Sequence, residues 1–236
     1  MNTIEFKHLI SNALYHTKYE PIIDTITNEI YAYEALSKFE VDQSLISTEE
    51  IFRKLHHNNS LFFNLEKRNK LLQVKCFTEN KKLFLNFDAD IVCTDEQRNY
   101  WQEFLKPIKD KIVIEITENG SDDEASSDIM RSFSLWLNKQ NIDSALDDFA
   151  QDGSMFSFFI MNQSKYIKID KSFLKQINSN MNYLPYLKGL IETIRLNKQK
   201  SIIEGVETFE DYNFVKDILK PDYMQGYYFS DLMIIK

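Results

Sequence analysis

The sequence predicts an α/β fold, and in particular a modified (β/α)8 TIM barrel, from three observations. Short runs rich in β-branched and aromatic residues alternate with longer segments of helical period, the pattern of a parallel sheet with crossover helices. Eight such runs occur in 236 residues, a size typical of this barrel. Polar residues follow many of the runs at once, as in barrel enzymes, and this feature disfavours the competing fold, an open doubly wound sheet.

The first two expected strands are joined by a short connection, TITNE, which leaves no room for a crossover helix. These two strands should therefore pair antiparallel, whereas the later strands, separated by helical segments, should pair parallel. The expected strands are, in order, residues 18–24, 29–39, 82–87, 111–117, 143–149, 165–170, 201–205 and 222–229.

Apolar residues recur at helical intervals in four longer segments. These expected helical segments are residues 47–73, 124–140, 184–198 and 209–220. The first opens with Ser47 and Glu50 at the spacing of a capping box. We interpret the charge run NLEKRNK (64–70) as a solvated helix face. The apolar cluster MFSFFIMN (155–162) is interpreted as a helix face that packs on the barrel.

The composition is typical of one globular domain, with 43% hydrophobic and 27% charged residues. A formal net charge of -8 argues against a nucleic-acid polymer as partner, because such binding requires clustered Lys and Arg. Cys76 and Cys93 are too few for a disulfide framework, which fits a reducing compartment. We find no signal-peptide pattern or membrane-spanning run and therefore expect a cytoplasmic protein without a membrane partner.

Candidate site residues lie in or just after the later half of the expected strands. They are Glu34, Asn86, Glu115, Asp147, Asp148, Lys168, Asp170, Glu204 and Gln225. Lys168 and Asp170 are two residues apart, so on a strand they face the same side. Glu115 and Glu118 differ in parity, so we place Glu115 in the site and give Glu118 a supporting role in the following loop.

The acidic residues of this set predict a metal site. Six carboxylates in one pocket would cost several kcal/mol for each uncompensated charge, far more than Lys168 alone could offset. The candidate ligands are all oxygen donors, which favours two divalent ions, Mg²⁺ or Mn²⁺, over Zn²⁺. The four histidines are interpreted as ordinary surface or helix residues. Such a cluster with one lysine suits hydrolysis of a phosphate ester.

Seven ordered motifs, taken together, resemble those of the EAL-domain family of cyclic di-GMP phosphodiesterases. They are YEALSKF (33–39), FLNF (84–87), IEITE (114–118), LDDF (146–149), YIKIDKSFL (166–174), IIEGVET (202–208) and YMQGYYFS (223–230). The resemblance implies a modified barrel with one antiparallel strand near its start, and a single EAL domain over residues 1–236 without a sensor or second catalytic domain. It also implies hydrolysis of cyclic di-GMP to linear pGpG in bacterial second-messenger signalling.

The resemblance further implies a role for each matched residue. The implied metal ligands are Glu34, Asn86, Glu115, Asp147, Asp148, Asp170 and Glu204. Lys168 orients or activates the attacking water, and Glu34 and Glu204 share the catalytic centre with it. Lys38 and Gln225 are the implied substrate-binding residues, and Glu118 and Glu207 look like loop supports. The paired aspartates of LDDF, which alone would suit a solvated turn, are then tolerated because cations neutralise them.

Three positions depart from the family pattern. Lys38 stands where the family usually has Arg, and Glu20 where it commonly has Gln. After LDDF the family usually has Gly-Thr-Gly, and here the loop reads Ala150-Gln151-Asp152. Because Ala150 has a Cβ and accepts positive φ poorly, we expect a different loop conformation and weaker binding of the second metal.

The resemblance also leaves alternatives open. A catalytically weak or inactive member would act as a cyclic di-GMP receptor or as a protein-interaction regulator, and a homodimer is compatible with either activity.

Overall fold

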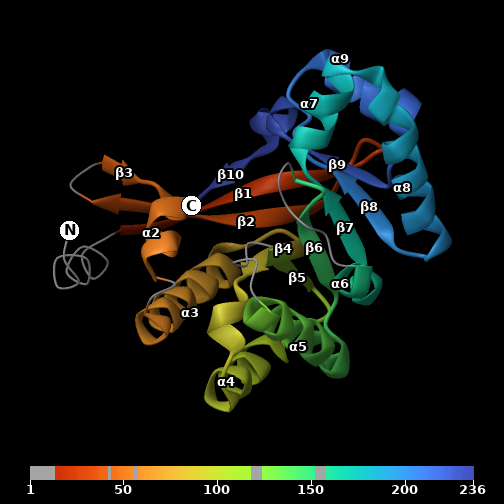
Figure 1. The fold of residues 1–236 in the computed structure, drawn as a ribbon. Coiled ribbons are helices and arrows are strands. Elements are labelled where there is room, and N and C mark those ends of the chain that lie inside the picture. The colour runs from red at the N-terminus through yellow and green to blue at the C-terminus, as the bar shows by residue number, and fades with distance from the viewer. Residues whose placement is uncertain (1–13, 42–43, 56–57, 118–123, 152–157) are drawn as a thin grey trace.

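The computed structural model describes residues 14–41, 44–55, 58–117, 124–151 and 158–236. Within these residues the chain forms a closed mixed barrel of eight strands surrounded by helices, which confirms the predicted fold class (Figure 1). The barrel closes because β1 pairs with both β2 and β9, so that the ring order is β1-β9-β8-β7-β6-β5-β4-β2.

The strands of the ring follow the expected runs closely. They are β1 (Leu14–Asp24), β2 (Ile30–Val41), β4 (Lys82–Phe87), β5 (Ile112–Thr117), β6 (Ser144–Phe149), β7 (Tyr166–Ile169), β8 (Lys200–Ile203) and β9 (Tyr223–Gln225). β1 runs antiparallel to both neighbours and the other pairs are parallel, as the short TITNE connection predicts. Our prediction of a strand over 222–229 was too long, because a 3-10 helix (Tyr227–Leu232) begins just after Gln225.

β1 and β2 continue beyond the ring as a long antiparallel ribbon. Two short strands that the sequence analysis missed, β3 (Ser44–Ile46) and β10 (Ile234–Ile235), pair with β2 and β1 respectively. Figure 1 shows this ribbon projecting from the barrel, with α2 (Thr48–Leu55) lying against it.

The helices agree with the prediction less well than the strands. Expected segment 47–73 is two helices, α2 and α3 (Asn59–Cys76). Further helices are α5 (Glu124–Gln140), α6 (Phe158–Gln163), α8 (Leu184–Leu196) and α9 (Phe209–Asn213), which a π-helix (Phe214–Leu219) continues. The helices α4 (Asp95–Leu105) and α7 (Lys171–Ser179) were not predicted from the sequence, and short 3-10 turns occur at Ala89–Val92 and Met181–Tyr183.

The barrel interior holds a separate apolar core at the amino ends of the strands. Its buried residues are Ile22, Ala32, Phe84, Val113, Ala145, Tyr166, Ile202 and Tyr223. At this end Tyr31 stacks on Tyr223, with ring centroids 4.0 Å apart, and its hydroxyl lies 2.6 Å from that of Tyr166. Side chains therefore fill this end of the barrel, and the opposite end is the one available for a site.

Gly226, directly after β9, packs against the backbone of the segment that follows β8. Its φ is +156°, and a Cβ there would lie 2.3 Å from the carbonyl oxygen of Val206. Gly226→Ala should lower the free energy of unfolding by roughly 3 kcal/mol. Gly189 in α8 has no atom within 4 Å of such a Cβ, so Gly189→Ala should raise it by about 1 kcal/mol. Denaturant titration of both variants checks this, and equal effects would contradict the stated packing.

Candidate active site at the carboxyl ends of the barrel strands

A polar layer lies directly above the apolar core of the barrel. Each parallel strand places its polar residue two positions after its interior apolar residue, as Tyr166 and Lys168 do on β7. Strand residues two apart face the same side, so the polar residues also face the barrel interior. The members of this layer are Glu34, Asn86, Glu115, Asp147, Lys168, Glu204 and Gln225. The antiparallel β1 contributes Glu20, two residues before Ile22.

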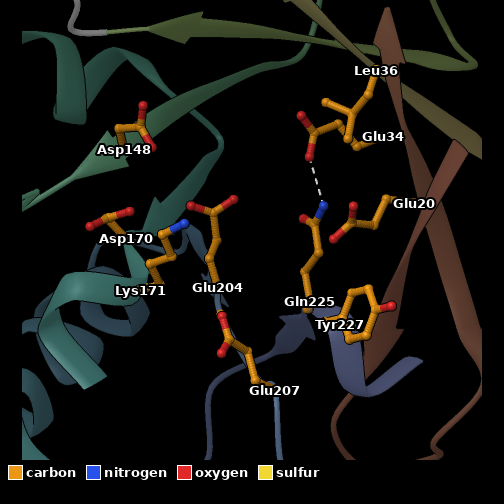
Figure 2. Close-up of a pocket in the computed structure, with 12 residues that line it drawn as sticks. Glu20, Glu34, Leu36, Asp148, Asp170, Lys171, Glu204, Glu207, Gln225 and Tyr227 are labelled. Atoms are coloured by element: carbon orange, nitrogen blue, oxygen red, sulfur yellow. Dashed lines mark hydrogen bonds between the residues drawn. The ribbon is translucent and has the colours of Figure 1, made fainter. Parts of the chain in front are cut away.

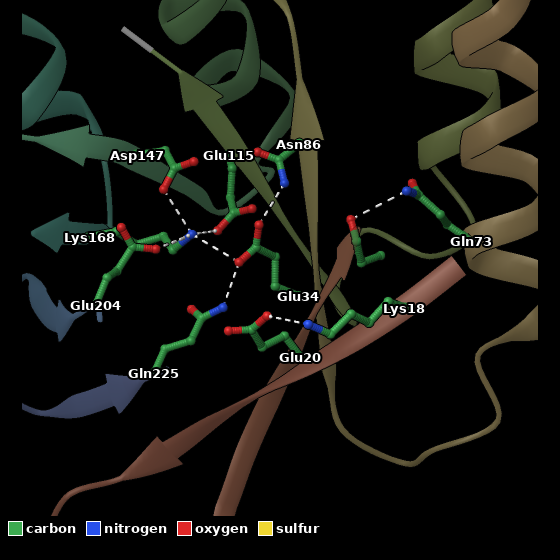
Figure 3. A network of polar contacts seen from close by, with 11 residues as sticks. Lys18, Glu20, Glu34, Gln73, Asn86, Glu115, Asp147, Lys168, Glu204 and Gln225 are labelled. Carbon is green, nitrogen blue, oxygen red and sulfur yellow. Dashed lines mark hydrogen bonds and ion pairs between the residues drawn. The ribbon is translucent and has the colours of Figure 1, made fainter. Parts of the chain in front are cut away.

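Lys168 occupies the centre of this layer (Figure 3). Its ammonium nitrogen lies within ion-pair distance of four carboxylates from four other strands or strand ends. The distances from Lys168 Nζ are 2.7 Å to Glu115, 2.8 Å to Asp147, 2.9 Å to Glu204 and 3.2 Å to Glu34. The lysine side chain is 1% exposed, so water screens these charges little.

Two amides fix the carboxylate of Glu34. Asn86 Nδ2 donates to its Oε1 over 2.8 Å, and Gln225 Nε2 donates to its Oε2 over 2.6 Å. Burial raises the pKa of Glu34, but Lys168 and the two amides together bring it below its usual value. Glu34 is therefore ionised at neutral pH.

The carboxylates outnumber the cation. Burial lowers the pKa of Lys168, but the carboxylates of Asp147, Glu115, Glu204 and Glu34 raise it well above its usual value. Burial, with the charge of Glu34, raises the pKa of Glu115 well above its usual range. Glu115 Oε2 and Gln225 Oε1 are buried without a hydrogen-bond partner among the described residues. Orphaned oxygens beside an excess of negative charge fit divalent cations with oxygen ligands.

Asp147 and Asp148 both face the site, although neighbours on a regular strand point to opposite sides. Asp148 has a φ of +52°, and the β6–β7 pairing shifts register between Leu146 and Phe149. This irregularity brings carboxylate oxygens of Asp147, Asp148 and Glu204 within 4.8 Å of one another. Burial, followed by the charge of Asp147, raises the pKa of Asp148 to about 7, and burial raises that of Glu204 to about 8.

The other expected site residues lie around a pocket of about 290 Å³ beside this centre (Figure 2). Asp170 lines it, and its Oδ1 accepts from Ser172 N over 2.9 Å and so caps α7. Glu207 also lines it, after the turn at Gly205, whose φ of +72° is favourable only for glycine. Glu118 lies outside the described residues.

A larger pocket of about 690 Å³ opens on another side of the acidic centre. Lys38 lines it and is not among the residues that form ion pairs in the acidic centre. The pocket extends from Asp147 and Asp148 to the helix α2. Its lining residues are Glu34–Lys38, Thr48, Glu49, Phe52, Arg53, Glu66, Lys70, Gln73, Asn86, Asp88, Asp147 and Asp148.

Our interpretation of residues 64–70 as a solvated face was wrong. Glu66, Asn69 and Lys70 are buried, because α3 turns this side of the helix toward β2 and the larger pocket. Glu66 accepts from Lys70 Nζ over 2.6 Å and from Asn69 over 2.8 Å. Gln73 donates to Ser37 Oγ over 3.1 Å. The only sign of this buried pair in the sequence is the i, i+4 spacing of Glu66 and Lys70. Opposite charges at this spacing also occur on exposed helix faces, so the spacing does not predict burial.

The loop after β6 also differs from our expectation. Ala150 has a φ of +64°, so the alanine does adopt the left-handed conformation that we expected it to avoid. Gln151 N donates to Asp148 O over 3.0 Å, which closes a tight turn around Phe149 and Ala150. The turn therefore holds both Asp148 and Ala150 in a conformation that costs about 1 kcal/mol for a residue with a Cβ.

Comparison with known proteins shows the family to which the chain belongs. The chain matches the EAL domain family over residues 5–231 and therefore belongs to it. It is 26% identical over 215 residues to the cyclic di-GMP phosphodiesterase TpdA of Vibrio parahaemolyticus, an alignment that covers 91% of this chain and 36% of TpdA. The chain thus spans little more than a third of the length of this curated relative.

Solved structures share the fold. The EAL domain of FimX from Pseudomonas aeruginosa, bound to c-di-GMP, matches with a TM-score of 0.80 at 19% identity, covering 97% of this chain and 95% of that chain. The Bacillus subtilis YkuI protein, in complex with substrate c-di-GMP and calcium, matches with a TM-score of 0.75 at 19% identity, covering 97% and 57%. Among the described helices, none is both long and apolar enough to span a bilayer.

The raised pKa values predict a pH-dependent response to divalent cations. In the folded protein the pKa values of Asp148 and Glu204, about 7 and about 8, lie above the usual values that these groups have in the unfolded chain. The free energy of unfolding of the metal-free protein therefore falls as pH rises toward these values and the two groups ionise. A bound cation requires the ionised forms, so its stabilising effect should grow over the same range. Saturating Mg²⁺ should raise Tm by roughly 5 °C above pH 8 and by much less near pH 6.

Differential scanning fluorimetry with and without Mg²⁺ measures this response. Asp148→Asn should reduce the shift, whereas Glu103→Gln, an exposed residue of α4, should leave it unchanged. A shift that is equal at both pH values would contradict the assignment of cation ligands.

The strained loop predicts a stabilising substitution. Ala150→Gly should raise the free energy of unfolding by about 1 kcal/mol, because glycine adopts positive φ without steric strain. Ala89, which also packs partly buried against the core, is outside the positive-φ residues. Ala89→Gly should therefore be destabilising, and chemical denaturation of the two variants compares them. A loss of stability in both would show that the turn carries no strain.

Proposed function

We propose that this protein is a metal-dependent phosphodiesterase that hydrolyses cyclic di-GMP to linear pGpG in bacterial second-messenger signalling. The observation that carries this proposal is the set of four carboxylates around Lys168 beside a pocket of about 690 Å³. Membership of the EAL domain family, and TpdA as a relative, support cyclic di-GMP as the substrate.

The proposed ligands of two Mg²⁺ or Mn²⁺ ions are oxygen donors of the polar layer and its rim. They are Glu34, Asn86, Glu115, Asp147, Asp148, Asp170 and Glu204. Such ions, when bound, would lower the pKa of the attacking water and stabilise charge on the phosphate. The YkuI structure contains calcium together with substrate c-di-GMP, which supports a divalent ion as cofactor in this proposal.

Lys168 acts in this proposal as a hydrogen-bond donor and not as a base. The surrounding carboxylates hold its pKa well above the usual value, so it stays protonated at neutral pH. Its ammonium orients the attacking water, whose oxygen bonds to phosphorus as the bond from phosphorus to the 3′ oxygen breaks. One proton of the attacking water ends on the 3′ oxygen, which leaves as a hydroxyl, and the product carries a 5′ phosphate.

The larger pocket suits a guanine nucleotide. Its volume lies in the range of small-molecule sites. Glu66 keeps unused acceptor positions for the N1–H and N2–H donors of guanine, and Lys70 keeps donors for O6. Lys38 on the pocket wall and Gln225 beside Glu34 are the proposed substrate-binding residues from the sequence analysis. Glu207 at the rim supports the loop after β8.

Incubation with cyclic di-GMP and Mg²⁺ or Mn²⁺, followed by chromatography of the products, tests the proposal. We expect pGpG from the wild-type protein. Glu34→Gln should lower kcat/KM by at least about a thousandfold, because it removes a charged ligand from the centre. Lys168→Met should lower kcat severely, and Glu103→Gln serves as the matched control.

Tm is measured for each variant in the presence of Mg²⁺. This measurement distinguishes a loss of catalysis from a loss of activity caused by unfolding. Binding of cyclic di-GMP without any linear product under either metal would refute the enzyme and favour a receptor. Full activity of Glu34→Gln would refute the assigned site.

A further inference from the structure

The far wall of the larger pocket carries cations that the acidic centre does not use. Arg53 on α2 and Lys38 on β2 both line this wall, and both side chains are exposed to it. No hydrogen bond or ion pair joins Arg53 to another described residue. Its neighbour Lys54, in contrast, pairs with Glu50 on the same helix.

The position of Arg53 is fixed by its helix. Ile51 and Leu55 of α2 are fully buried, and the ring of Phe52 lies 5.4 Å from that of Phe62 on α3. At the start of the helix, Thr48 Oγ1 donates to Ser37 O over 2.9 Å. Since Ser37 precedes Lys38 on β2, this bond holds the helix that carries Arg53 against the strand that carries Lys38.

The pocket therefore has opposite charges at its two ends. Asp147 and Asp148 lie at the end where cations and a reacting phosphate would bind, and Arg53 with Lys38 lies at the other. Guanidinium and ammonium groups bind phosphate through charge-assisted hydrogen bonds. A cyclic dinucleotide has two phosphates, and only one of them can react at the acidic centre at a time.

We propose that Arg53 binds the second, non-reacting phosphate of the cyclic dinucleotide together with Lys38. This inference rests on the proposed function. Arg53 would supply the bidentate guanidinium that Lys38 lacks, from a neighbouring element instead of from β2. Glu49, which lines the same wall, opposes this binding by its negative charge.

Steady-state kinetics with cyclic di-GMP test the role of Arg53. The contact is made equally in ground and transition states, so Arg53→Gln should raise KM about tenfold and leave kcat within about twofold. Arg53→Lys, which keeps the charge without the fork, should raise KM about threefold. Glu49→Gln should lower KM, because it removes repulsion from the same phosphate. Lys54→Gln is the matched control on α2 and should leave KM unchanged.

The outcomes separate the inference from the function on which it rests. A wild-type protein that neither binds nor hydrolyses cyclic di-GMP would refute the proposed function. An active wild type with an unchanged KM in Arg53→Gln would refute only the role of Arg53. A KM for Arg53→Lys as high as that for Arg53→Gln would indicate stacking on a base and overturn the phosphate contact. A fall in kcat at constant KM would place Arg53 at the reacting phosphate and also overturn it.

Discussion

The structure depends on one interaction, the contact of the buried Lys168 ammonium with four carboxylates in the mouth of the barrel. The partners come from β2, β5, β6 and the end of β8, so these strands and β7 must be in register for the charges to meet. A slip of one residue in one of these strands would exchange its interior and exterior faces and break at least one of the ion pairs. An unpaired buried carboxylate costs several kcal/mol, so the ion cluster disfavours such slips.

The polar layer is tolerated because the apolar layer beneath it is complete. On seven parallel strands an interior apolar residue precedes the polar one by two positions, and the aromatic side chains of Phe84, Tyr166 and Tyr223 fill the closed end. Stability and chemistry are therefore divided between the two ends of the same strands, as in other barrels of this kind. The excess of carboxylates leaves the open end less stable without cations, and a bound cation would link stability to function.

Residues two apart on a strand face the same side, which explains why the polar layer could be predicted from the sequence. Buried pairs of polar side chains explain why the exposed face of α3 was predicted wrongly. Lys168 follows Tyr166 and Glu115 follows Val113 in runs whose β-branched composition is unambiguous. The faces of α3 could not be assigned in this way, because Glu66 and Lys70 satisfy each other and so are buried in spite of their charge. Such pairing depends on which strand the helix packs against, which a single sequence does not reveal. α4 and α7 were missed because each buries only two apolar residues, Trp101 and Leu105 in α4 and Leu174 and Ile177 in α7, so the helical pattern is weak.

The two adjacent aspartates show how a departure from regular geometry creates a site. On an ideal β6, Asp147 would face the interior and Asp148 the surrounding helices, where an unpaired carboxylate would be unfavourable. The left-handed φ of Asp148 and the shift in the β6–β7 register turn both carboxylates toward Glu204. Asp tolerates a left-handed φ better than most residues do. Ala150, two residues later, also has a left-handed φ, and alanine lacks this tolerance. The strain at Ala150 is thus a consequence of the same turn that directs the Asp148 carboxylate toward Glu204.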